Sequence, residues 1–141
     1  MEIDKKIDSK EIYAESYIRY LTEVLGKIST KEISDFIDCM IAASSRGSSI
    51  YFIGNGGSAA TASHFVNDIS IGTKSMDAPF RAISLCDNQP VITAIANDYG
   101  YEYIFSQQLA VLLKKDDVVV AISASGNSPN LINAIDVAKQ K

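Results

Sequence analysis

The stretch VVVAISASGNS, residues 118–128, decides the fold. It begins as a continuous apolar run and passes directly into a loop of hydroxyl and glycine residues. Apolar residues in an unbroken run indicate a strand buried on both faces, which is typical of a parallel sheet. The stretch SIYFIGNGGS, residues 49–58, has the same design. Together the two stretches predict parallel strands whose loops leave the sheet at the same edge.

Helical patterns alternate with these strands. A further strand is predicted over 81–85, and helices are predicted over 59–70, 91–97, 103–113 and 130–141. Such alternation predicts βαβ units, in which an open parallel sheet lies between two layers of helices. We therefore expect a three-layer α/β domain over residues 48–141. Because the alternation stops after its third strand, we also expect the chain to be truncated at its C-terminus.

The first part of the chain has a different pattern. Apolar residues recur with a period near 3.6 over 17–28 and again over 33–41, which predicts two helices. Between them, Ser29 and Glu32 have the spacing of a capping box at the start of the second helix. The wide apolar stripes exceed what a small sheet domain can cover. We expect residues 1–47 to form a helical hairpin that is buried between subunits.

Composition narrows the class of protein. The 141 residues are 47% hydrophobic and carry a formal net charge of −4, so no basic face for nucleic acid is indicated. No apolar run approaches the roughly 20 residues of a membrane span, and the polar N-terminus lacks the apolar region of a signal peptide. Cys39 and Cys86 lie in apolar stretches and are predicted to be small core residues. These features predict a cytoplasmic protein.

Two loops have the composition of an anion site. They are GNGGS at residues 54–58 and SASGNS at residues 123–128. Glycines let a ligand approach the backbone, N–H groups at a helix start favour anions, and serine hydroxyls add donors. A phosphate is the natural ligand, although such loops could also simply turn the chain. Neither a Walker lysine nor the third glycine of a dinucleotide fingerprint is present.

His64 is the only histidine. It lies four residues before Asp68, so both project from one face of the predicted helix, which Ala60 continues toward the glycine loop. This pair could hold a divalent metal or share a proton. A structural role for a lone histidine is the alternative, and two ligands do not make a zinc site.

A polar break, NDYG at residues 97–100, separates two predicted helices. Asn97 or Asp98 is predicted to cap the helix that follows. The aromatic residues after the break are predicted to form a core cluster or a subunit contact; they are Tyr99, Tyr101, Tyr103 and Phe105.

Four motifs in chain order resemble the sugar isomerase (SIS) domain family, and within it the phosphoheptose isomerases. They are GNGGSAA at 54–60, HF at 64–65, ANDYG at 96–100 and ISASGNS at 122–128. The resemblance implies a flavodoxin-like parallel sheet, an N-terminal helical hairpin used in assembly, and a homotetramer. It implies a phosphorylated sugar as substrate, in a reaction that interconverts sedoheptulose 7-phosphate and a heptose 7-phosphate through an enediol.

The resemblance also implies roles for individual residues. Substrate contacts fall on Asn55, Gly56, Gly57, Ser58, Asn97 and Asp98, and phosphate contacts on Ser123, Ala124, Ser125 and Ser128. His64 matches a zinc ligand. Asp68 matches a glutamate that is both catalytic and metal-binding in the isomerases, so zinc is the implied cofactor.

Two departures from the family pattern bear on activity. Aspartate is one methylene shorter than glutamate, and misplacing a catalytic group by about 1 Å can cost about 10²-fold in rate. The family also uses a glutamine and a histidine from a C-terminal helix that these residues do not include. We expect the 141-residue chain on its own to be inactive. The alternative is a non-catalytic SIS module that binds a sugar phosphate, or that acts as an adaptor for a protein such as the bacterial replication initiator.

Overall fold

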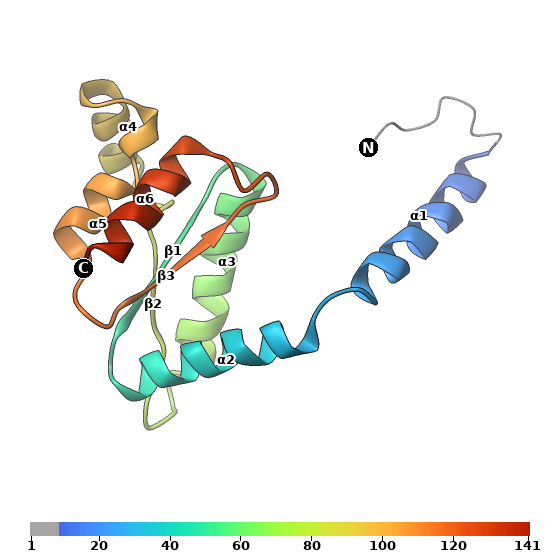
Figure 1. The fold of residues 1–141 in the computed structure, drawn as a ribbon, viewed down its shortest axis with the longest axis horizontal. Helices are drawn as coiled ribbons and strands as arrows, with labels where there is room; N and C mark the ends of the chain where they lie inside the picture. Colours follow the sequence, from blue (N-terminus) through green and yellow to red (C-terminus); the bar gives the residue numbers. More distant parts are fainter. Residues whose placement is uncertain (1–8) are drawn as a thin grey trace. The chain divides into compact units, whose positions relative to one another are not determined.

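The computed structural model describes residues 9–141 (Figure 1). The chain forms two compact units, of which the first ends at Phe36 and the second spans Ile37–Lys141. The assembly role predicted for residues 1–47, and their pairing into a hairpin, stay predictions. Among the described residues, no helix combines the length and the apolar character that crossing a membrane requires.

The two N-terminal helices form as the sequence predicts, with different bounds: the first begins earlier and ends three residues earlier than predicted, and the second is longer at both ends. Helix α1 spans Lys10–Leu25, and none of its residues is buried. Helix α2 spans Thr30–Ser45. The Ser29 half of the predicted capping box is confirmed, because the Ser29 hydroxyl accepts a hydrogen bond from the Glu32 backbone N–H at 3.2 Å. The return bond to the Glu32 carboxylate does not form among the described residues.

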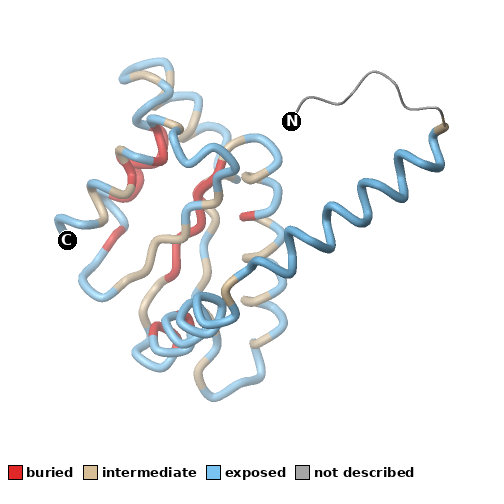
Figure 2. The backbone as a smooth tube through the Cα atoms, turned by 45° about the vertical axis from the view of Figure 1, so that its right-hand side comes forward, coloured by how far each residue is buried: buried red, intermediate tan, exposed pale blue. Residues whose placement is uncertain are grey.

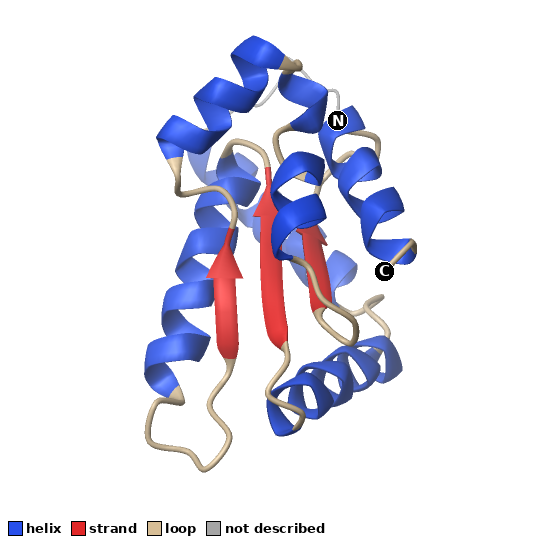
Figure 3. Ribbon diagram, turned by 90° about the vertical axis from the view of Figure 1, so that its left-hand side faces the viewer, coloured by secondary structure: helices blue, strands red, loops and turns tan. Residues whose placement is uncertain are grey.

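The second unit is built on a parallel sheet of three strands in the order β2-β1-β3 (Figure 3). Strand β1 spans Ser49–Gly54, β2 spans Arg81–Ser84 and β3 spans Val118–Ile122. The central strand pairs in parallel with both neighbours, and its last residue, Gly54, lies opposite Ile122 of β3. The predicted α/β class and parallel sheet are confirmed.

Helices cover both faces of this sheet, which gives the predicted three layers. Ile50 and Phe52 of β1 pack with α3 (Gly57–Gly72), where Phe52 stacks on Phe65 with ring centroids 5.1 Å apart. Tyr51 and Ile53 alternate with them and face α5 (Ser106–Leu112) and α6 (Pro129–Lys139). Because β1 is buried on both faces, it forms the centre of the core (Figure 2).

Two local predictions prove wrong. Asn97 and Asp98 do not cap the following helix, because α4 (Gln89–Asp98) continues through them. The short 3-10 helix η1 (Tyr101–Tyr103) is instead preceded by Gly100, whose φ of 112° suits glycine. Of the four aromatic residues predicted to form a core cluster or a subunit contact, Phe105 is buried in the core and the three tyrosines are exposed in the single chain. A subunit contact for these tyrosines stays a prediction. Cys39 is exposed rather than a core residue, and Cys86 is partly buried.

Candidate ligand-binding site

The site lies where the two glycine- and serine-containing loops leave the sheet. Because Gly54 and Ile122 are register partners, the two loops begin side by side. The chain then enters α3 on one face of the sheet and α6 on the opposite face. Loops that diverge in this way open a crevice at the carboxyl ends of the strands, which is where open α/β sheets bind ligands.

A pocket of about 220 Å³ occupies this crevice. Its lining consists of Asn55, Ser58, Ile122, Ser123, Ala124, Ser125, Ser128 and Leu131. Six of these residues belong to the substrate-binding set that the resemblance implies. No lining side chain carries a charge, so any anion bound here would be held by neutral hydrogen-bond donors.

Two serine hydroxyls in the loop after β3 accept hydrogen bonds from the backbone of that loop. The Ser123 hydroxyl oxygen accepts a hydrogen bond from the Gly126 backbone N–H at 3.0 Å, and the Ser125 oxygen accepts one from Asn127 at 3.4 Å. A hydroxyl that accepts from its own loop still has its O–H proton to donate. Gly126 has a φ of 68°, so the turn that sets these bonds depends on glycine.

Asn55 joins the two sides of the pocket. Its side-chain amide exchanges hydrogen bonds with that of Asn130, at 2.9 Å and 2.7 Å, and accepts a third from the Tyr101 hydroxyl at 3.0 Å. Asn130 stands at the start of α6 and is only 2% exposed. The sequence analysis missed both Asn130 and this role of Tyr101. The sequence feature that could have drawn attention to Asn130 is its place directly after Pro129, in the first turn of α6.

Other predicted site residues lie outside this lining. Gly56 precedes α3 and Gly57 is its first residue, and both are exposed. Asn97 and Asp98 are exposed at the end of α4, where the Asn97 amide donates to the Asp98 carboxylate at 2.8 Å. Their predicted contacts with substrate stay predictions.

His64 and Asp68 form the predicted pair on one face of α3. The distance from His64 Nε2 to Asp68 Oδ2 is 3.3 Å, and the two side chains are 79% and 59% exposed. Asp68 lies ten residues beyond Ser58 on the same helix, which is a rise of about 15 Å. Among the described residues, no group of three or more histidine, cysteine or acidic side chains could hold a metal. The pair therefore does not form a zinc site by itself.

Cys86 lies just after β2, outside the pocket lining, and has the chemistry of a core residue. Its Sγ donates to the Gly54 carbonyl at 3.5 Å. Burial raises the pKa of this thiol, with the nearby Asp87 charge adding to the effect. Because the thiolate is the reactive form, Cys86 is no nucleophile at neutral pH.

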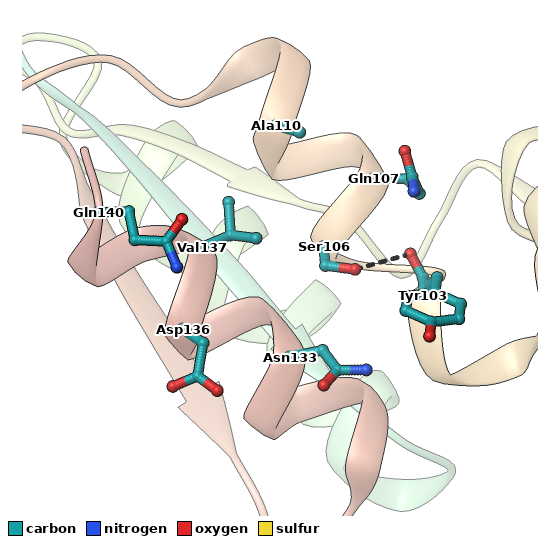
Figure 4. Close-up of a pocket in the computed structure, with 8 residues that line it drawn as sticks. All are labelled: Tyr103, Ser106, Gln107, Ala110, Asn133, Asp136, Val137 and Gln140. Atoms are coloured by element: carbon teal, nitrogen blue, oxygen red, sulfur yellow. Dashed lines mark hydrogen bonds between the residues drawn. The ribbon is translucent and has the colours of Figure 1, made fainter.

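A second, larger pocket of about 320 Å³ lies between α5 and α6 (Figure 4). Its lining includes Tyr103, Ser106, Asn133 and Asp136, and none of the predicted site residues. It opens on the outer side of two helices rather than at the carboxyl ends of the strands. The smaller pocket has the position and the donors that ligand binding needs.

Fold and pocket together are typical of α/β domains of the doubly wound type that bind small molecules, and the candidate ligand site lies between β1 and β3. The family model described as the SIS domain matches residues 13–141. The chain is 41% identical over 127 residues to the probable phosphoheptose isomerase of Thermoplasma acidophilum, covering 90% of this chain and 70% of that protein. It is 40% identical over 111 residues to the phosphoheptose isomerase of Trichlorobacter lovleyi, covering 79% of this chain and 57% of that protein.

A solved structure agrees with these relatives. The phosphoheptose isomerase of Neisseria gonorrhoeae superposes with a TM-score of 0.82 at 32% identity, covering 93% of this chain and 69% of that one. The chain thus belongs to the SIS domain family, in its phosphoheptose isomerase branch. It spans between about half and seven tenths of the length of the curated relatives it matches.

Gly54 offers a test of the strand-to-loop geometry. A Cβ atom on Gly54 would lie 2.7 Å from the Ser58 carbonyl oxygen, so the backbone of the loop would have to shift. We expect Gly54→Ala to lower the free energy of unfolding by about 1–3 kcal/mol, as overpacking does. Denaturant unfolding followed by circular dichroism measures this.

Gly57→Ala is the matched control. Nothing lies within 4 Å of a Cβ at Gly57, which is the first residue of α3. Alanine in a helix is favoured over glycine by about 0.5–1 kcal/mol, so this variant should be no less stable than the wild type. Equal stability of the two variants would contradict the close approach at Gly54.

Proposed function

We propose that the protein is an aldose–ketose isomerase that interconverts sedoheptulose 7-phosphate and a heptose 7-phosphate. The relatives at 40–41% identity carry the name phosphoheptose isomerase. The observation that carries the proposal to this chain is the pocket between β1 and β3, lined by four serines and Asn55. We also propose a cytoplasmic location, because two free cysteines fit a reducing compartment.

The pocket serves the phosphate end of the substrate in this proposal. Ser123, Ser125 and Ser128 line it, and a phosphate dianion has oxygens enough to accept hydrogen bonds from all three hydroxyl groups. Hydrogen bonds from neutral donors to a charged acceptor are roughly twice as strong as bonds between neutral groups. The loop therefore binds phosphate without a lysine or arginine in its lining.

Asp68 is the proposed base. In an aldose–ketose isomerisation a base removes a proton from one carbon and returns it to the next, through an enediol. The reacting carbons, C1 and C2, lie at the opposite end of the seven-carbon chain from the 7-phosphate. Ser58 lies at the phosphate end of the proposed site, and Asp68 lies about 15 Å further along α3. This spacing fits a substrate whose carbon chain extends from the pocket along α3. The group that assists at oxygen comes from outside the described residues or from another subunit.

Zinc is proposed only for an assembled site. His64 and Asp68 supply two ligands from one helix face, whereas a zinc site usually has four. The remaining ligands would come from outside residues 9–141 or from a neighbouring subunit. No step of the proposed reaction depends on the metal.

Replacing two serines tests the substrate site. We expect the Ser125→Ala, Ser128→Ala double variant to bind sedoheptulose 7-phosphate more weakly, because each lost hydrogen bond costs about 0.5–1.5 kcal/mol and more when the acceptor is charged. Isothermal titration calorimetry on the full-length protein measures the loss. Ser75→Ala is the control, because Ser75 is exposed in the turn before β2, at the other edge of the sheet.

A turnover assay distinguishes an isomerase from a protein that only binds the sugar phosphate. The proposal predicts that the wild-type protein interconverts the two heptose phosphates in a coupled assay and that the double variant does so with a raised KM. Tight binding of the sugar phosphate without turnover would contradict the proposed reaction and favour a non-catalytic SIS module. An affinity unchanged in the double variant would contradict the assignment of the serine loop.

We further propose that the protein assembles through α1 and α2, as a homotetramer. Large apolar side chains on these helices are exposed in the single chain, Ile18 by 63% and Leu25 by 57%. Sedimentation should show an oligomer, and Ile18→Glu should shift it toward smaller species, because a charge would be buried in the interface. Arg19→Glu, on a neighbouring face of α1, should leave it unchanged. A monomeric wild-type protein at micromolar concentration would contradict this proposal.

A further inference from the structure

We propose that Asn130 and Tyr101 are positioning residues, which hold the side-chain amide of Asn55 so that one Nδ2–H group points to an oxygen of the bound sugar phosphate. The inference rests on the proposed function, because it concerns the same pocket. It adds two residues that lie outside the pocket lining, and it fixes the direction of one hydrogen bond to the ligand.

The first support is the reciprocal pair of amides. Asn55 Nδ2 donates to Asn130 Oδ1 at 2.9 Å, and Asn130 Nδ2 donates to Asn55 Oδ1 at 2.7 Å. Asn130 is 98% buried, so its amide has lost its water partners and depends on this pair. The pair joins the loop after β1 to the first turn of α6, across the pocket that both line or flank.

The second support is the count of donors and acceptors on Asn55. An amide oxygen has two lone pairs and an amide nitrogen has two hydrogens. Asn130 and the Tyr101 hydroxyl, at 3.0 Å, fill both lone pairs of Oδ1. Nδ2 uses one hydrogen on Asn130, and within residues 9–141 it donates to no other group. Asn55 thus offers the ligand a donor and no acceptor.

This polarity matches the rest of the pocket. The hydroxyl oxygens of Ser123 and Ser125 each accept one hydrogen bond from their own loop, and each hydroxyl keeps its proton to donate. A pocket that presents donors from both sides selects ligands rich in acceptor oxygens, such as phosphate and carbonyl groups. Because the amide is held in place before the ligand arrives, little ordering cost remains to be paid on binding.

Tyr101→Phe separates positioning from a purely structural role. The phenol of Tyr101 is 55% exposed, so removing its hydroxyl leaves the Asn55–Asn130 pair and the fold in place. The substitution frees one lone pair of Asn55 Oδ1. The amide can then accept a hydrogen bond from the ligand or from water as well as donate one. Tyr99→Phe is the matched control, since Tyr99 is 63% exposed and its hydroxyl bonds to no other group among the described residues.

Asn130→Asp tests the other partner. The carboxylate still accepts from Asn55 Nδ2 but cannot donate to Asn55 Oδ1, and its charge repels that oxygen. The control is Asn133→Asp, which places the same charge three residues further along α6, outside the pocket lining, and which also loses the hydrogen bond from Asn133 to the Glu102 carbonyl. Comparing the two aspartate variants removes the general effect of added negative charge on an anionic ligand.

The experiment titrates the full-length protein and each variant with sedoheptulose 7-phosphate by calorimetry and records the unfolding temperature of each without ligand. We expect Tyr101→Phe to raise Kd by about 2- to 12-fold, the value of one neutral hydrogen bond, with an unfolding temperature equal to that of Tyr99→Phe. We expect Asn130→Asp to raise Kd by more than Asn133→Asp does.

The outcomes distinguish this inference from the proposed function. If the wild type binds the sugar phosphate and both test variants bind it as their controls do, the positioning role is wrong and the proposed substrate stands. If Tyr101→Phe loses affinity only in proportion to a fall in unfolding temperature, the role is structural and the inference is overturned. If the wild type does not bind sedoheptulose 7-phosphate, both fail.

Discussion

The parallel register of β1 and β3 is the constraint on which the rest of the site depends. It sets Gly54 opposite Ile122, so the two loops start as neighbours, while α3 and α6 take them to opposite faces of the sheet. The crevice is a consequence of this divergence and not of any one side chain. Burial of β1 on both faces holds the register, because a slip by one residue would exchange Ile50 and Phe52 with Tyr51 and Ile53.

Within that crevice the chemistry comes from neutral groups whose direction is fixed. Backbone N–H groups donate to the Ser123 and Ser125 oxygens of one loop, and two side chains donate to the amide oxygen of Asn55 in the other. Both loops are left with protons to donate. An anionic ligand is the natural partner of such a site, and the absence of charge in the lining avoids the desolvation cost of a buried lysine or arginine.

Local sequence patterns were enough to predict the strands, the parallel sheet and the pocket-lining serines, because each of these depends on a short run of residues. Contacts between distant segments were not predictable in this way. Asn55 and Asn130 lie 75 positions apart, and nothing in either stretch alone indicates their pairing. Asn97 and Asp98 were misplaced as a cap because α4 continues through them. Cys39 was misplaced because its apolar neighbours on α2 are exposed in the single chain, Ile37 by 48% and Ile41 by 51%.

The most direct test of the central claim is an amide NMR titration of the protein with sedoheptulose 7-phosphate. If the crevice between β1 and β3 binds the phosphate, the largest shifts will fall on the backbone amides of residues 55–58 and 123–128 and on the side-chain amide of Asn55. The alternative binding site is the larger pocket between α5 and α6. Shifts concentrated on Ser106, Asn133 and Asp136, with the two loops unchanged, would contradict the account.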